Sequence, residues 1–70
     1  MADVLSTVTG AVLEVSVSVG EAVSEGQQLL VIESMKMEFP VEAEESGTVT
    51  AIAVQEGTAV KPDDLLLTID

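Results

Sequence analysis

The 70 residues of this chain are enough for one small domain, and they carry 13 acidic residues against two lysines, a formal net charge of −11. This charge disfavours binding to nucleic acid or to an anionic membrane surface, because both depend on cationic side chains that meet phosphates. The chain also lacks histidine and cysteine, which removes the commonest general base, the commonest zinc ligands and any disulfide. We therefore expect protein partners, no metal site and no catalytic residues.

The sequence has no segment that predicts membrane insertion or export. No apolar run approaches the ~18–20 residues of a transmembrane helix, and the first residues lack the basic region of a signal peptide. The absence of cysteine fits a reducing compartment. We expect a soluble, cytoplasmic protein.

The predicted elements are β-strands along the whole chain. In residues 14–19, valines alternate with polar residues, the period of a strand with one solvated face, and residues 28–33 form an apolar strand after a turn at 24–26. Residues 38–43 form the next strand, which Pro40 places at a sheet edge because proline cannot donate a ladder hydrogen bond.

The last third of the chain repeats this order of strand and turn. Residues 49–55 predict a strand, Pro62-Asp63 predicts a type I turn, and residues 65–70 predict an apolar strand. No segment of ten or more residues has a 3.6-residue period, so we expect no regular helix.

The chain contains one internal repeat. When residues 4–33 are laid over residues 41–70 without a gap, ten of the thirty positions are identical. Two glycines of each half recur, and we expect them at turns that need a positive φ. Four strands per half predict an all-β fold: a flattened barrel or sandwich of two four-stranded antiparallel sheets, related by a pseudo-two-fold axis within a single domain 1–70. The identical pairs are Val4/Val41, Gly10/Gly47, Val12/Val49, Val17/Val54, Gly20/Gly57, Ala22/Ala59, Val23/Val60, Leu29/Leu66, Leu30/Leu67 and Ile32/Ile69.

Residues 34–40 have no counterpart in the repeat and join its two halves. Met35 and Lys36 are predicted to form a two-residue hairpin turn, although they lack the Asn-Gly chemistry that favours such turns. The hairpin would present Lys36 at a protruding tip between two methionines, Met35 and Met37. Two flexible, polarisable side chains around an exposed amine are typical of a surface that another protein recognises.

Ser34-Met35-Lys36-Met37 resembles the Ala/Val-Met-Lys-Met motif of the biotinyl domain family, the biotin carboxyl carrier proteins and their relatives. The resemblance covers essentially the whole chain, since the two-fold repeat and the central hairpin lysine match the family's plan. Ser34 stands where the family more often has alanine. The connection from Val19 to Val23 is too short for the protruding thumb of some bacterial acetyl-CoA carboxylase carriers, so the chain is similar to the compact members.

The resemblance implies a function for the hairpin. A biotin protein ligase would attach biotin to the amine of Lys36 and would recognise Ser34, Met35 and Met37. The domain would be a non-catalytic carrier of a biotin-dependent carboxylase, moving carboxybiotin between the biotin carboxylase and carboxyltransferase sites. The family's fold places the chain termini at one end of the molecule and the lysine at the other.

Three alternatives remain open on the residues alone. A lipoyl carrier shares the fold and the hairpin lysine, but that family has Asp-Lys-Ala at the tip. An unmodified acidic adaptor barrel would use the tip as a docking loop. An enzyme with Lys36 as a Schiff-base nucleophile would need a desolvated pocket, which a hairpin tip does not provide. Lys61 is interpreted as a solvated turn residue, and the acidic segment 42–45 matches no EF-hand loop.

Overall fold

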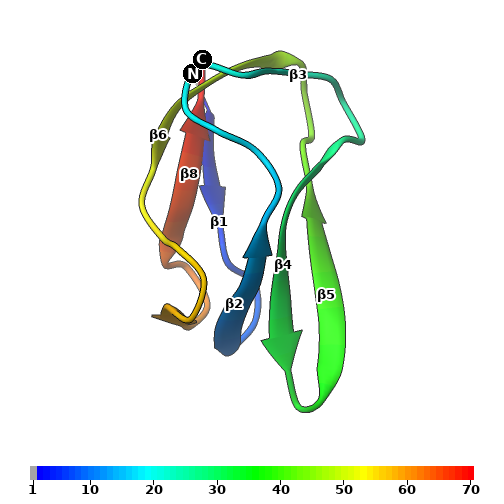
Figure 1. The fold of residues 1–70 in the computed structure, drawn as a ribbon, viewed down its shortest axis with the longest axis vertical. Helices are drawn as coiled ribbons and strands as arrows, with labels where there is room; N and C mark the ends of the chain where they lie inside the picture. Colours follow the sequence, from blue (N-terminus) through cyan, green and yellow to red (C-terminus); the bar gives the residue numbers. More distant parts are fainter. Residues whose placement is uncertain (1) are drawn as a thin grey trace.

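The computed structural model describes residues 2–70, and it contains eight β-strands over that range (Figure 1). None of these residues belongs to a helix long and apolar enough to cross a membrane. The strands are β1 (Ala2–Leu5), β2 (Gly10–Val15), β3 (Ala22–Val23), β4 (Gln28–Ser34), β5 (Met37–Glu42), β6 (Gly47–Ile52), β7 (Ala59–Val60) and β8 (Leu65–Ile69).

The strands form two four-stranded sheets that pack face to face. One sheet has the order β1-β8-β6-β3, the other has the order β5-β4-β2-β7, and every neighbouring pair is antiparallel. The molecule is elongated, with principal extents of 30 × 18 × 17 Å. The predicted all-β fold of two antiparallel sheets is confirmed.

The two sheets have pseudo-two-fold symmetry. Exchanging β1 with β5, β2 with β6, β3 with β7 and β4 with β8 converts the strand order of one sheet into that of the other. The irregularities in pairing follow the same exchange: the register shift between Val12 and Glu14 of β2 recurs between Val49 and Ala51 of β6. The two halves therefore have the same local structure as well as similar sequences.

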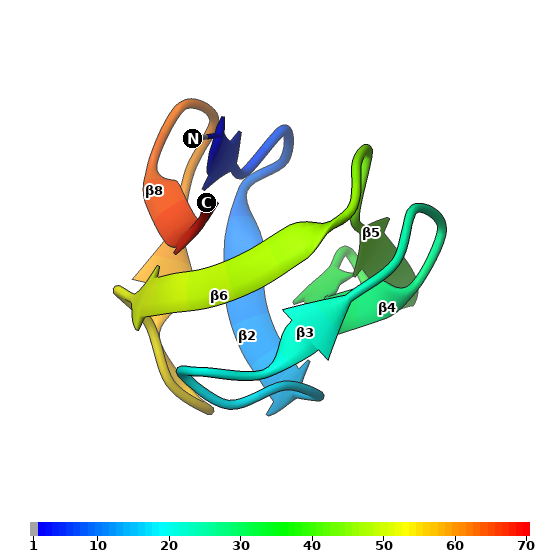
Figure 2. The ribbon, with the colours of Figure 1, turned by 90° about the horizontal axis from the view of Figure 1, so that it is seen from above.

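This symmetry places the β4–β5 hairpin and the chain termini at opposite ends. The exchange carries the end of β4 onto the end of β8, and the start of β5 onto the start of β1, so the termini are the symmetry image of the hairpin. Figures 1 and 2 show the two termini side by side, and Figure 1 shows the hairpin at the far end of the long axis.

The core lies between the sheets and consists of aliphatic side chains. Most of its members are repeat-related pairs, so each half contributes the same residue to the interface between the sheets. The single buried polar residue of the described chain, Ser6, satisfies its hydroxyl by donating to the carbonyl of Val8 at 2.7 Å. The core residues are Val12, Val17, Val23, Leu29, Leu30, Ile32, Ala43, Val49, Val60, Leu66, Leu67 and Ile69.

The expectation that β2 continues to Val19 was wrong. Strand pairing ends at Val15, and the chain then turns toward β3. Alternating burial persists for one more step, since Val17 is 6% exposed, but Val19 is 62% exposed. Val19 lies within a turn closed by Gly20, so its side chain leaves the face that the preceding valines share.

The recurring glycines have two different structural reasons. Gly20 and Gly57 have φ values of 94° and 90°, as expected for turns. Gly10 and Gly47 begin β2 and β6 without positive φ, and there the expectation was wrong. A Cβ on Gly10 would overlap the carbonyl oxygen of Glu33, and one on Gly47 would lie 2.5 Å from Cγ2 of Ile69. These two positions need glycine because another strand approaches closely.

The turn at residues 61–64 is not the predicted type I turn. The amide of Asp64 donates to the carbonyl of Lys61 at 3.1 Å, and Asp63 has a φ of 76°. A positive φ at the third residue is the signature of a type II turn, in which glycine is favoured. The repeat-related turn at residues 24–27 has Gly26 at this position, with a φ of 86°.

Replacing Asp63 with glycine is expected to stabilise the fold by about 0.5–1 kcal/mol, since the αL conformation is strained for a side chain with a Cβ. Urea denaturation monitored by circular dichroism measures the change. The matched control is Gly26→Asp, which is expected to destabilise the fold by a similar amount. An unchanged midpoint for both variants would contradict this account of the two turns.

Candidate functional site

The site is the tip of the β4–β5 hairpin. The two strands pair in continuous register from Val31↔Pro40 through Ile32↔Phe39 to Ser34↔Met37, leaving Met35 and Lys36 as the two turn residues. This is the predicted two-residue hairpin. The strand that contains Pro40, β5, lies at the edge of its sheet, which confirms the predicted edge position. An edge strand tolerates proline, because its outer side has no neighbouring strand that needs a backbone N–H donor.

The turn has the backbone conformation that two-residue hairpins require. Met35 and Lys36 have φ values of 53° and 65°, both in the left-handed region, and a positive φ at both central residues is typical of a type I′ turn. Neither residue is glycine or asparagine, so the turn is strained by about 1–2 kcal/mol per residue. The register of the long β4–β5 ladder holds this conformation, since the tip sequence itself does not favour the turn.

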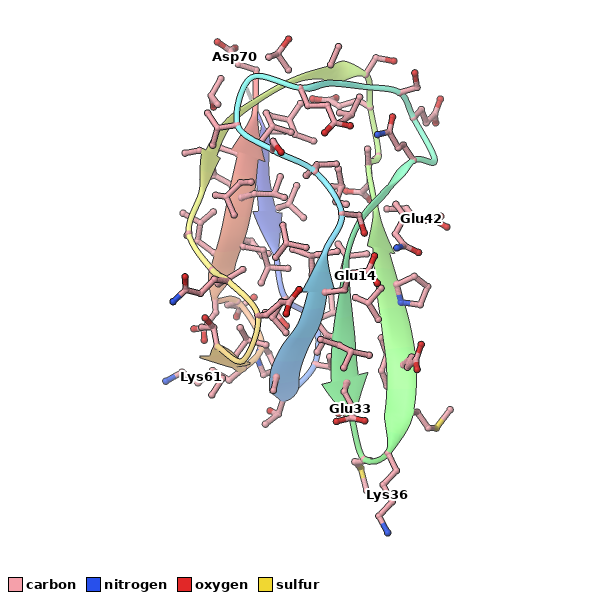
Figure 3. The ribbon with its side chains drawn as sticks, in the orientation of Figure 1. Glu14, Glu33, Lys36, Glu42, Lys61 and Asp70 are labelled. Atoms are coloured by element: carbon pink, nitrogen blue, oxygen red, sulfur yellow. The ribbon has the colours of Figure 1, made fainter. Side chains whose placement is uncertain are left out.

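The tip side chains project into solvent. Met35 is 91% exposed and Met37 is 60% exposed, which makes them the two most exposed large apolar side chains of the described residues apart from Val19. Lys36 is exposed and its amine extends beyond the end of the ribbon (Figure 3). The structure therefore places an accessible primary amine and two accessible thioethers on three consecutive residues at the end of the hairpin.

Ser34, the residue before the turn, is tied to the body of the domain. Its hydroxyl donates a hydrogen bond to the backbone carbonyl of Thr9, in the loop between β1 and β2, at 2.5 Å. Ser34 is half-buried, unlike the exposed residues that follow it. The hydroxyl thus links the base of the hairpin to a loop 25 positions earlier in the chain.

Replacing Ser34 with alanine is expected to lower the free energy of unfolding by about 0.5–1.5 kcal/mol, the usual contribution of one hydrogen bond. Hydrogen exchange of the amides in the hairpin should accelerate, while exchange in the β6–β8 ladder should change only with global stability. Ser34→Thr keeps a hydroxyl and serves as the control. Equal exchange rates in all three proteins would show that this hydrogen bond does not hold the hairpin.

Two carboxylates lie directly below the tip. Glu33 of β4 and Glu38 of β5 are cross-strand partners, and both are exposed (Figure 3 labels Glu33). Like charges directly opposite each other on a sheet are unfavourable. The pairing adds to the strain of the turn, so the hairpin is held by the rest of the ladder and by Ser34 rather than by its own tip sequence.

The second lysine has a different setting. Lys61 lies in the turn between β7 and β8, and its backbone amide donates to the carboxylate of Asp64 at 3.0 Å. It is exposed, and it has a valine and a proline as chain neighbours instead of methionines. Lys61 therefore shares the exposure of Lys36 but lacks the methionine flanks.

The contacts at the base of the hairpin were not predicted from the sequence. The Thr9 carbonyl that accepts from Ser34 is a backbone atom, and no residue pattern marks it. The pairing of Glu33 with Glu38 follows from the hairpin register, since both residues lie two positions outside the turn. That pair was therefore accessible to sequence analysis once Met35 and Lys36 had been assigned to the turn.

Residues 1–69 match the family described as biotin-requiring enzyme, the biotin/lipoyl attachment domains. The chain belongs to this family. It is 48% identical over 60 residues to the biotin carboxyl carrier protein of Streptococcus mutans, a match that covers 86% of this chain and 46% of that protein. The predicted membership of the biotinyl domain family is thereby confirmed, and the chain spans about half the length of this relative.

Solved structures of this family have the same fold. The urea carboxylase of Kluyveromyces lactis superposes with a TM-score of 0.92 and 33% identity, over 99% of this chain and 6% of that one. The lipoyl domain of the 2-oxoglutarate dehydrogenase complex from Azotobacter vinelandii gives a TM-score of 0.78 and 31% identity, over 89% of this chain and 78% of that one. Together with the family match, these structures show that the chain has the fold of a biotin/lipoyl attachment domain.

Proposed function

We propose that Lys36 is the attachment site for biotin and that a biotin protein ligase loads it. The observation that carries the proposal is the position of the Lys36 amine, exposed on a two-residue turn at the end of the molecule opposite the termini. A partner attached to the termini, or holding that end, leaves the tip free to enter another protein's active site. The residues present fit a covalent amide, which needs one accessible primary amine and no other protein group.

The loading reaction is a nucleophilic acyl transfer. The ligase first joins the carboxyl group of biotin to the AMP part of ATP as an acyl adenylate, which releases pyrophosphate. Nζ of Lys36, as the neutral amine, then attacks the carboxyl carbon. An amide bond forms, the bond to AMP breaks, and the amine gives up a proton. The attached biotin supplies the carboxyl-carrying chemistry, and the domain supplies attachment and position.

The partners we propose are the biotin carboxylase and carboxyltransferase sites of one carboxylase. A tethered group reaches a nearby site at an effective concentration of about millimolar when the geometry permits both visits. The β4–β5 ladder stiffens the base from which Lys36 extends, so the tip reaches outward without the body of the domain having to enter either site. Met35 and Met37 are proposed to be the side chains that the ligase contacts.

Incubation of the chain with ATP, biotin and a biotin protein ligase tests the proposal, with intact mass spectrometry as the measurement. One biotinyl group per chain is expected. The same incubation with lipoate and a lipoate ligase tests the lipoyl carrier, which remains the second candidate because of the fold shared with the Azotobacter vinelandii lipoyl domain. Addition of lipoate without addition of biotin would replace the proposal with that candidate.

Replacing Met35 or Met37 with alanine is expected to slow biotinylation by about tenfold or more while the free energy of unfolding stays within about 0.5 kcal/mol, as for most surface substitutions. Both side chains are mostly exposed, so they contribute to recognition and little to the core. Single-turnover loading kinetics and urea denaturation give the two values. The control is Val19→Ala, which removes an apolar side chain about as exposed as Met37 from a turn far from the tip. A loss of folding on Met35→Ala would contradict this assignment.

A further inference from the structure

The two sheets remain open along one side, where edge strands β1 and β5 lie across from each other. Each is the terminal strand of its sheet, so each has one edge without a neighbouring strand. A groove of about 520 Å³ lies between them and is lined by residues of both strands, of the β1–β2 loop and of the segment after β5. The part of β5 that lines the groove is residues 40–42, the half of the strand farther from the hairpin tip.

The walls of this edge groove are apolar on the side of the core. Val4 of β1 and Val41 of β5 are half-buried and pack against the core, and Ile69 of β8, beside β1, is buried. Leu5 also lines the groove and is 42% exposed. Together these side chains form an apolar surface that is partly exposed to solvent.

The rim of the edge groove is acidic. Its lining includes the exposed carboxylates Asp3, Glu42, Glu44 and Glu45, and none of its lining residues is basic. Both lysines of the chain lie outside it, at the hairpin tip and in the β7–β8 turn. A ligand that complements the groove therefore carries positive charge at its edges and apolar groups toward its floor.

We propose that the edge groove is the docking site for an extended basic segment of a partner protein, with apolar side chains alternating with lysine or arginine. In an extended segment, successive side chains point to opposite sides, so one set reaches the apolar floor and the other reaches the acidic rim. The open edge of β1 offers main-chain donors and acceptors to such a segment, as in other cases of strand addition. Pro40 removes one donor from β5, which favours pairing along β1.

A second copy of this chain is a poor occupant. Two chains that each carry a formal net charge of −11 repel one another, and a second copy brings only two lysines. The groove also lies apart from the hairpin tip, so a docked segment leaves Lys36 accessible. The proposal does not depend on modification of Lys36, and it holds for the unmodified chain.

The test is a fluorescence anisotropy titration of the unmodified chain against a labelled, end-blocked peptide of four Val-Lys repeats at low ionic strength. Saturable binding is expected. It should weaken by about tenfold in a variant with four rim carboxylates neutralised, because the surface charge pairs with the peptide lysines are lost: Asp3→Asn, Glu42→Gln, Glu44→Gln and Glu45→Gln. A peptide of four Gly-Lys repeats should bind about tenfold more weakly, because it lacks apolar side chains for the floor.

The control variant neutralises four exposed carboxylates outside the groove and has the same net charge: Glu14→Gln, Glu25→Gln, Glu33→Gln and Glu56→Gln. Its affinity should change less than twofold, and amide shifts in the NMR spectrum of the native chain should cluster on β1 and residues 40–45. Equal weakening by both variants, shifts centred on the hairpin tip, or no saturable binding would each overturn the proposal. Biotin loading of Lys36 is measured separately, so failure here leaves the proposed attachment site standing.

Discussion

Replacing Lys36 with arginine is expected to abolish biotin loading. Arginine keeps the positive charge and similar length, but its guanidinium stays protonated in proteins and is not a nucleophile. The exposed tip and its turn should persist, since the side chain of Lys36 projects into solvent. Intact mass after incubation with ligase, ATP and biotin should show one biotinyl group on the native chain and none on Lys36→Arg.

The matched control is Lys61→Arg, which alters the only other lysine. It should load fully, because Lys61 lacks the methionine flanks and is not part of the proposed site. Both variants should unfold at the same denaturant concentration as the native chain. Full loading of Lys36→Arg with loss of loading in Lys61→Arg would move the attachment site to the β7–β8 turn.

Replacing Gly10 with alanine is expected to produce the largest loss of stability among the substitutions considered. The added Cβ would overlap the backbone carbonyl oxygen of Glu33 and lie 3.0 Å from Cγ2 of Ile32, and a backbone group in a central strand cannot move aside without disturbing its ladder. Overpacking of this kind costs about 1–3 kcal/mol or more. A core of this size provides only ~3–5 kcal/mol of net stability, so a large unfolded population is expected.

Circular dichroism and urea denaturation measure this effect, and Gly20→Ala is the control. Gly20 has open space around its Cβ position but a φ of 94°, so its replacement should cost only about 1 kcal/mol through backbone strain. Gly47→Ala should behave like Gly10→Ala, since its Cβ would lie 2.5 Å from Cγ2 of Ile69 and 3.0 Å from the carbonyl oxygen of Asp70. A smaller loss for Gly10→Ala than for Gly20→Ala would contradict the close-approach explanation.

Gly10→Ala should also affect the functional tip. Gly10 follows Thr9, whose carbonyl holds Ser34, and its Cβ would press on Glu33, the residue before Ser34. In the folded fraction of Gly10→Ala, the hairpin amides should therefore exchange faster than the hairpin amides of the Ser34→Ala variant. The stability of the fold and the orientation of the tip thus depend on the same few backbone contacts.

The fold class, the two-fold repeat and the central hairpin could all be predicted from the sequence alone. Alternating valines and the absence of any helical period predicted an all-β fold, because side-chain alternation in a strand is a local property of the backbone. The repeat predicted two halves of four strands. The unmatched residues 34–40 marked the hairpin between them, with Met35 and Lys36 as its turn, and the same motif supported the family resemblance.

Only the tertiary structure decided the features that depend on strands far apart in the chain. The hydrogen bond from Ser34 to Thr9, the close approach of β4 to Gly10 and the groove between β1 and β5 all arise from pairing and packing that local patterns do not encode. The turn at Asp63 also has a contact with a distant segment: Pro62-Asp63 is compatible with more than one turn type, and in the turn with positive φ the Asp63 amide donates to the carbonyl of Ser6 at 2.8 Å. Residue periodicity reports which face of an element is buried, whereas the partner that buries it is chosen by the fold as a whole.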